Sequence, residues 1–537
     1  MRDSDWLSAA GEYQDLISKL CSSDPRLRSR CSKNIAQQIP WPNPHARLVM
    51  LENDNTKAGT FGSPVQHTSA SLKEHLSAQP APQPGAGRVF ILEGLHPEYI
   101  AVLGAHCKMH PAVFIDQERT VVISPKTQNS SDFFSLPSSV RTAEHLTMKY
   151  YELLSLPQKV VNFRMCCAET GRHIGMTRIK GELLDVGVVR RKCTIWNKKY
   201  PDGGWDCLIL TDPPLRAVMT SKVSGYTSSK LSYTTREKVH ISSSPFQNGY
   251  LDFTPHSTQL TTLRGPPRTC LLDDLAFYLQ THPLFPPGTP NPSTPGPPNP
   301  SLPPIPSPPT NTPAIFAQKI IASHYLQLFT FIRSVTSDVQ FQMSRLDRMG
   351  MDYFDTTFVE SGQWSDAQAL ERRISEYTSD MESLMLGVGI PLDDKPDVPG
   401  CISPVVASGT ASTIPWYDTA ADLQVLRMRF CDVRRHAEML NAAITGLTSI
   451  SGNQKALREA RSTKALTLVG LVFIPLAYTA TLFSMTESFG PGGERFWVYF
   501  AVSVPLIVCV LGAYTVLDRF GDRILERVEG FGVSRRR

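Results

Sequence analysis

Several features that would quickly assign a function are missing from this sequence of 537 residues. It contains no GxxxxGK[ST], HExxH or GxSxG element, so we expect no enzyme of those common classes. Its 11 cysteines are scattered without a CxxC pair, which argues against a disulfide framework or a zinc ribbon. A net charge of +5 on so long a chain is too weak to indicate nucleic acid as a partner.

The N-terminal stretch MRDSDWLSAAGEYQDLISKL also lacks the basic start and apolar core of a cleaved leader, so we expect none. Charge is absent from two stretches further on, residues 465–485 and 496–517, which hold no Asp, Glu, Lys or Arg. Each has roughly the 20 residues needed to cross a bilayer core of ~30 Å. The alternative is a buried hairpin of a soluble core, but interior apolar runs are usually only about 10 to 14 residues long. The pattern predicts two membrane spans, with the lipid bilayer as a partner.

The flanking charges predict the orientation of these spans. Basic residues precede the first stretch (Lys455, Arg458, Arg461, Lys464) and follow the second (Arg519, Arg523, Arg527), whereas the loop TESFGPGGER holds one Arg and two Glu. Because positive residues stay inside, both termini should face the cytosol from the plasma membrane or an organelle membrane, or the matrix of a mitochondrion.

Composition divides the rest of the chain. Residues 1–87 carry scattered Pro, Ser and Gly and are predicted to be a disordered arm. Residues 88–281 hold short strand and helix patterns, which predict an α/β cytosolic domain. Residues 282–316 are so rich in proline that they predict an extended linker, with an SH3 or WW ligand as the alternative.

Helical periodicity dominates from residue 317 to residue 463, the predicted stalk. Its first two helices show the apolar stripes Ile320 to Val335 and Leu370 to Leu384. Thr419 and Asp422 are spaced as a capping box for a third helix. If Gly446 and Gly452 are tolerated, that helix continues into the first span as a rod on the order of 100 Å long. The two-span hairpin would then occupy residues 464–518, and residues 519–537 would form a basic cytosolic tail.

Two helices from one chain enclose no pore, so transport would need several copies around an axis. The first span is the better lining candidate because it continues the stalk and carries Thr467, Thr479, Thr481 and Ser484. Helical spacing places one face at Thr486, Thr481, Ala477, Ile474, Gly470 and Leu466. Helix packing by small residues explains the same face equally well. Pro475 and Pro505 are candidate kinks or merely tolerated breaks.

No acid lies on that face. Mg²⁺ gives up water reluctantly, so a pore without carboxylates would pass it hydrated, with hydroxyls or carbonyls touching the water shell and an apolar constriction as gate. A proton-coupled pump would need acids or histidines within the spans, and the two stretches contain none. A divalent ion would be cargo, and no cofactor is expected.

The run ALTLVGLVFIPLAYTATLFSMT, a short loop and FWVYFAVSVPL resemble the two-span end of the CorA-type divalent cation transporters, particularly the divergent CorA-like proteins of fungi. The basic helix ALREARSTKA and the F-x-P-L element at 473–476 belong to the resemblance. So do FILEGLHPEYIAVLGAHCKMHPAVFIDQ, RRKCTIW and GGWDCLILTDPP in the soluble part. The resemblance covers residues from about 88 to 517 and excludes the arm and the proline linker.

The resemblance implies a homopentamer with a cytosolic funnel, long stalk helices, a pore-lining first span and an outer second span. Members move Mg²⁺, Co²⁺, Ni²⁺ or Zn²⁺. Their Gly-Met-Asn selectivity motif falls here on Ser484, Met485 and Thr486, so only the Met is kept. Thr486 offers a hydroxyl where the family has a side-chain carbonyl. In the family, loop carboxylates gather cations, and Glu487 and Glu494 are the candidates for that role here, although a merely soluble loop would also contain such acids.

Other candidates carry less weight. Family members gate through cytosolic cation sites, but the acid clusters Asp273/Asp274 and Asp393/Asp394/Asp397 are better explained as solvated turns. His106 and His110 have helical spacing but no third ligand nearby, which favours a helix surface over a zinc site. Cys166 and Cys167 would point to opposite faces of a strand, so a shared metal is not expected.

Two hypotheses of different class follow. The first is a CorA-type channel or transporter for hydrated divalent cations, with Mg²⁺ as the leading candidate, lined by the first span. The second is a non-conducting, membrane-anchored scaffold or sensor that keeps the architecture with a degenerate selectivity motif.

Overall fold

The computed structural model describes residues 6–27, 43–53, 60–119, 144–156, 165–177, 185–223, 233–254, 265–282, 313–345, 363–392, 418–484 and 495–533. The chain divides into two compact units. The first comprises residues 1–342 and 367–438, and the second comprises residues 343–366 and 439–537. The sheets and most helices belong to the first unit, and the membrane-length helical segments belong to the second.

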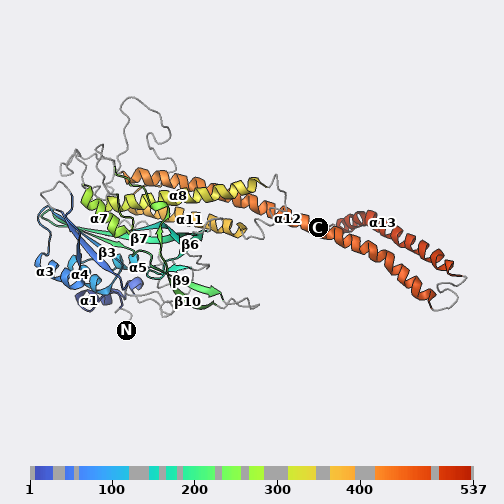
Figure 1. Ribbon diagram of the computed structural model, residues 1–537, viewed down its shortest axis with the longest axis horizontal. Helices are drawn as coiled ribbons and strands as arrows, with labels where there is room; N and C mark the ends of the chain where they lie inside the picture. Colours follow the sequence, from blue (N-terminus) through green and yellow to red (C-terminus); the bar gives the residue numbers. More distant parts are fainter. Residues whose placement is uncertain are drawn as a thin grey trace, which may run out of the picture. The chain divides into compact units, whose positions relative to one another are not determined.

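A mixed sheet organises the first unit (Figure 1). Its strands run in the order β11-β4-β7-β8-β3-β1-β2, and β6 pairs with β7. Strands β3 and β8 are parallel, and the other neighbours in this sheet are antiparallel. The strands are β1 (Arg47–Glu52), β2 (Val65–His67), β3 (Gly87–Glu93), β4 (His145–Leu156), β6 (Ile174–Thr177), β7 (Asp185–Lys199), β8 (Trp205–Thr211) and β11 (Ser244–Pro245). A second sheet has the order β10 (Tyr233–His240), β9 (Ala217–Val223), β5 (Cys166–Cys167).

Helices cover both faces of the large sheet, which explains why every residue of β3 (GRVFILE) is buried. On one face lie α1 (Glu12–Leu20), α3 (Ser69–Ala78), α4 (Pro97–Cys107) and α5 (Ala112–Glu118) (Figure 1). The other face carries α7 (Leu271–Thr281), α8 (Ala314–Ser344) and the start of α12 (Thr419–Phe483), with α11 (Gln363–Val388) beside them. Short 3₁₀ turns, η1 (Pro25–Leu27) and η3 (Phe246–Asn248), complete the described elements of this unit.

The prediction of a disordered arm over residues 1–87 is wrong for the described parts of that range. Strand β1 pairs with β3 along its whole length, and Trp6, Leu7 and Tyr13 are buried in the core beneath α4. The α/β domain therefore begins far before residue 88. The prediction failed because these short segments show little periodicity of their own, and their burial depends on partners distant in sequence.

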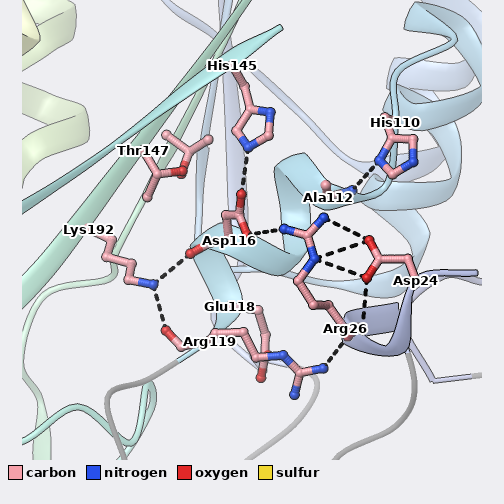
Figure 2. Close-up of polar contacts among 11 residues, drawn as sticks. Asp24, Arg26, His110, Ala112, Asp116, Glu118, Arg119, His145, Thr147 and Lys192 are labelled. Atoms are coloured by element: carbon pink, nitrogen blue, oxygen red, sulfur yellow. Dashed lines mark hydrogen bonds and ion pairs between the residues drawn. The ribbon is translucent and has the colours of Figure 1, made fainter. Parts of the chain in front are cut away.

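Close contacts hold this N-terminal segment in place. Gly104 of α4 lies so near Tyr13 that a Cβ there would come within 2.3 Å of the ring. Arg26 forms a bidentate pair with Asp24 and reaches Asp116 of α5 at 3.6 Å, as Figure 2 shows. His145 of β4 contacts the other oxygen of Asp116 at 2.8 Å (Figure 2). Residues from three separate segments of the sequence thus share one network of polar contacts.

The predicted helices of the stalk are confirmed, with small shifts at their ends. The two apolar stripes lie on α8 and α11. Helix α8 begins at Ala314, inside the predicted linker 282–316, of which residues 283–312 lie outside the described residues. In the first unit these helices contribute Ile320, Leu328 and Ile374 to the main core.

The third helix starts where expected but not with the predicted capping box. The Asp418 carboxylate accepts the N–H groups of Ala420 and Ala421, both at 3.1 Å, so Asp418 is the cap. Asp422 instead pairs with Lys319, and Thr419 donates to Gln318 at 2.9 Å. Contacts to α8 therefore compete with capping for both predicted side chains.

Helix α12 continues for 65 residues without interruption. It passes through Gly446, Gly452 and Pro475, as the rod interpretation required. The last described helix, α13 (Trp497–Val533), also runs beyond the predicted end of the hairpin at residue 518, so the basic tail is helical as far as Val533.

Candidate functional site

The candidate site is the hairpin formed by the end of α12 and the start of α13. Both helices are long and apolar enough to cross a membrane, each with a mean hydropathy of 2.0 over its most apolar window. Only 11% and 6% of these windows are buried inside the chain. A hairpin in a soluble core would be mostly covered, so the exposure argues against that alternative and is consistent with a membrane protein of two spans.

Within the hairpin the two helices are joined by hydroxyls. Thr479 Oγ1 lies 2.8 Å from Ser503 Oγ, and both residues are buried. Thr479 also lies 3.0 Å from the carbonyl oxygen of Pro475, to which it can donate. Phe483 meets Tyr499 edge to face, with ring centroids 6.3 Å apart. Small hydroxyl residues at such a crossing allow close approach of the helices and satisfy one another in an apolar surrounding.

The predicted lining face lies away from this contact. At about 100° per residue, Thr481 and Ala477 project roughly opposite Thr479 on α12. Both are exposed, and Ile474 and Leu466 on the same face are 70% and 75% exposed. The Thr481 hydroxyl donates to the Ala477 carbonyl at 2.7 Å, and its oxygen retains acceptor capacity.

The C-terminal end of this face is described only in part. Ser484 is exposed and is the last described residue of the first apolar stretch. The remaining predicted selectivity and loop residues lie outside the described residues: Met485, Thr486, Glu487 and Glu494. Pro475 is buried against the hairpin contact, and Pro505 is exposed within α13. The helices continue across both prolines.

The acid cluster Asp273/Asp274 is not a solvated turn. It forms the first turn of α7, and Asp274 is buried, accepting from the Tyr250 hydroxyl at 2.9 Å and from the Arg268 N–H at 2.6 Å. Burial raises the pKa of Asp274 to about 6, although these hydrogen bonds oppose the rise. The solvated interpretation was wrong because the partners come from other segments. The cluster at 393–397 lies outside the described residues.

His106 and His110 do not share a helix. Helix α4 ends at Cys107, where Lys108 adopts a left-handed conformation, so the helical spacing of the two histidines is broken. His110 Nδ1 accepts from the Ala112 N–H at 3.2 Å, and His106 lies 3.9 Å from Asp206. Cys166 and Cys167 separate into different clusters on β5, as predicted. In the described ranges, no group of three His, Cys, Asp or Glu residues is arranged to hold a metal ion.

Sequence patterns did not reveal the buried charge pairs of the sheet. Arg88 of β3 donates two hydrogen bonds, of 2.8 and 3.0 Å, to the carboxylate of Asp206 on the parallel strand β8. Both residues are almost fully buried. Burial alone would raise the pKa of Asp206, but the nearby His106 and the hydrogen bonds from Arg88 and Tyr200 outweigh it and lower the value. The available signal was a charge inside each of two apolar strand patterns, at Arg88 and at Asp206.

Neither a family model nor a curated protein matches this chain in the comparisons with known proteins. The CorA resemblance therefore stays a prediction.

Proposed function

We propose that this chain is one subunit of a CorA-type channel or transporter that passes hydrated divalent cations, Mg²⁺ first among them. Several copies would surround an axis, with α12 of each lining the pore and α13 outside it. The family resemblance supplies the expected number of subunits, five. On this proposal the orientation follows the flanking basic residues, with both termini in the cytosol.

The observation that carries the proposal is the separation of two faces on α12. Thr479 is occupied by the contact with α13, whereas Ile474, Ala477 and Thr481 are left uncovered in the single chain. A pore-lining helix needs both surfaces, one for its outer partner and one for the pore and the neighbouring subunits. The exposed face has hydroxyls towards its outer end and aliphatic side chains below, which suits a water shell above an apolar constriction.

The continuous helix supports coupling between the two units of the chain. The residues from Asp418 to Glu438 belong to the unit that holds the sheets, and the same helix carries the lining face. A change in the first unit that moves the start of α12 would have a direct covalent and helical connection to the pore. No metal is assigned a regulatory position on this proposal.

Flux measurements test the proposal. The purified chain would be reconstituted in liposomes that contain a Mg²⁺-sensitive dye, and Mg²⁺ entry compared between wild type, Thr481→Phe and Thr515→Phe. Thr481 and Thr515 are both exposed threonines whose hydroxyls donate to their own helix, but Thr515 lies on α13. We expect Thr481→Phe to abolish flux and Thr515→Phe to retain it.

Two further results are informative. Flux that appears only in Thr486→Asn would mean that the native Ser-Met-Thr sequence has lost conduction while the architecture is kept. Absence of flux in every variant, from liposomes with correctly assembled oligomers, would contradict the channel and favour the scaffold or sensor. Repeating the assay with Zn²⁺ and Co²⁺ identifies the ion.

A further inference from the structure

Two arginines follow the second apolar stretch on helix α13. Arg519 and Arg523 come two and six residues after Leu517, the last residue of that stretch. At 1.5 Å per residue these positions lie about 3 and 9 Å beyond it. The polar headgroup layer on each side of a bilayer is roughly 5–8 Å thick, and the long arginine side chain can extend along the helix towards it. Both positions are therefore within reach of lipid headgroups when the stretch spans a membrane.

The two positions fall on the side of α13 that is turned away from α12. Ser503, at the hydroxyl contact with α12, is 1% exposed and marks the side towards that helix. At about 100° per residue, positions 519 and 523 lie roughly opposite Ser503. Described residues on the same side are uncovered, since Val508 is 63% and Val516 is 56% exposed. The arginines thus continue a face that the single chain leaves open.

The neighbouring acids of α13 lie nearer to α12 and its basic residues. The hydroxyl pair and the aromatic pair of the hairpin set an antiparallel register between the two helices. Extended at equal rise, this register places Asp518 level with Lys464, and Asp522 within one residue of the level of Arg461. Opposite charges at matched levels attract one another. The acids beside the two arginines therefore have basic counterparts on α12. Glu526 lies about 13 Å beyond Leu517, outside the headgroup layer.

The spacing of the two arginines suits a single anionic group. Residues four apart are neighbours on a helix, and like charges at that spacing are destabilising unless an anion lies between them. Guanidinium groups form strong charge-assisted hydrogen bonds with phosphate oxygens. The opposite end of the hairpin has the contrary charge, because the loop TESFGPGGER holds two Glu and one Arg. An anionic headgroup would therefore favour the end that carries Arg519 and Arg523.

We propose that Arg519 and Arg523 bind the phosphate of an anionic phospholipid in the leaflet at this end of the hairpin. The proposal rests on the membrane insertion that the proposed function includes, and it does not depend on the pore. In the proposed assembly α13 lies outside α12, so the open face of α13 meets the lipid. The bound lipid would hold the end of the second span at the headgroup level.

Native mass spectrometry of the full chain in uncharged detergent micelles tests the proposal, with phosphatidylglycerol and phosphatidylcholine as the probes in separate titrations. Wild type should bind phosphatidylglycerol more tightly, because only this lipid of the two carries a net negative charge. Arg519→Gln should weaken phosphatidylglycerol binding about fivefold, which is the value of one basic residue near an anionic surface.

Arg495→Gln is the matched control. Arg495 is exposed and precedes the same apolar stretch at its other end, in the loop that holds two Glu. Its loss should change phosphatidylglycerol binding by less than about twofold. Arg519→Lys keeps the positive charge and should bind phosphatidylglycerol within about twofold of wild type. Binding of phosphatidylcholine should be the same in all variants.

Three results would overturn the proposal. The first is equal binding of the two lipids by wild type. The second is an equal loss of phosphatidylglycerol binding in Arg495→Gln and Arg519→Gln, or in Arg519→Lys and Arg519→Gln. The third is an equal loss of both lipids in Arg519→Gln, because recognition of charge would then not be the cause. The titrations measure no ion flux, so a chain that does not conduct can still show the expected lipid binding.

Discussion

The hydroxyls of Thr479 and Ser503 lie 2.8 Å apart and join the two membrane-length helices. When Thr479 donates to the Pro475 carbonyl, Ser503 is the donor in the pair, and both hydroxyls are satisfied. The contact between Thr479 and Ser503 determines which side of α12 faces α13. It thereby leaves Thr481 on the exposed side of α12, which lines the pore in the proposed assembly.

Breaking this pair should weaken the hairpin. We expect Thr479→Val and Ser503→Ala each to destabilise the folded chain, with a coupling free energy between them of about 0.6 kcal/mol and at most about 1.7 kcal/mol. A double-mutant cycle, measured by reversible unfolding in mixed detergent micelles, gives the coupling. Thr481→Val is the control, because its hydroxyl bonds only within its own helix and should show no coupling to Ser503→Ala.

The buried pair of Arg88 and Asp206 should dominate the acid sensitivity of the sheet. Asp206→Asn leaves the Arg88 charge buried without its partner and should cost about 3–5 kcal/mol. Because the pKa of Asp206 is lowered in the folded state, its contribution is present at neutral pH and is lost as the pH falls through the folded value. Denaturant unfolding at several pH values measures both effects. The exposed Asp202→Asn is the control, and equal losses in both variants would contradict the prediction.

The contribution of Asp274 to the free energy of unfolding should change with pH in the opposite direction. Burial raises its pKa from 3.8 to about 6, so the fold favours the protonated carboxyl. The contribution of Asp274 to the free energy of unfolding is therefore fully present below pH 4. This contribution decreases by about 3 kcal/mol as the pH rises through 6. We expect the unfolding free energy of Asp274→Asn to depend less on pH between 4 and 7 than that of wild type. Asp15→Asn, at an exposed position, is the reference variant. If the unfolding free energy of Asp274→Asn changes with pH as steeply as that of wild type, the prediction is contradicted.

Two glycines should respond oppositely to the same substitution. Gly104→Ala would place a Cβ within 2.3 Å of Tyr13 and should push α1 away from α4, at a cost of about 1–3 kcal/mol. Gly446 lies inside α12, and a Cβ added there would meet no atom within 4 Å outside its own helical turn. Gly446→Ala should therefore stabilise the helix by about 0.5–1 kcal/mol. Thermal unfolding of the two variants gives the signs, and a stable Gly104→Ala would contradict the close packing of the N-terminal segment.

Local sequence patterns indicated the strands and helices whose own residues show an apolar run or a helix breaker. Strands β3 and β8 and helix α4 lie in RVFILEGL, WDCLILTD and HPEYIAVLGAHC, within the range 88–281 where strand and helix patterns were predicted, and each stretch has the apolar run or the breaker residues of its element. Strand β1 was missed because six residues among prolines and serines become a strand only when β3 supplies the hydrogen bonds. The cap at Asp418 was missed for a similar reason, because Asp422 finds Lys319 on α8, 103 positions away in the sequence.

The sequence by itself determined the two membrane-length helices and the continuous helix that leads into the first of them. Hydrophobicity, the absence of charge and helical periodicity are local properties, and they set the character of a helix before it meets a partner. The tertiary structure alone decided that Thr479 faces α13 while Thr481 is uncovered, and that Lys149 and Lys192 meet across two strands. These are contacts between distant segments, whose geometry depends on helix rotation and strand register rather than on composition.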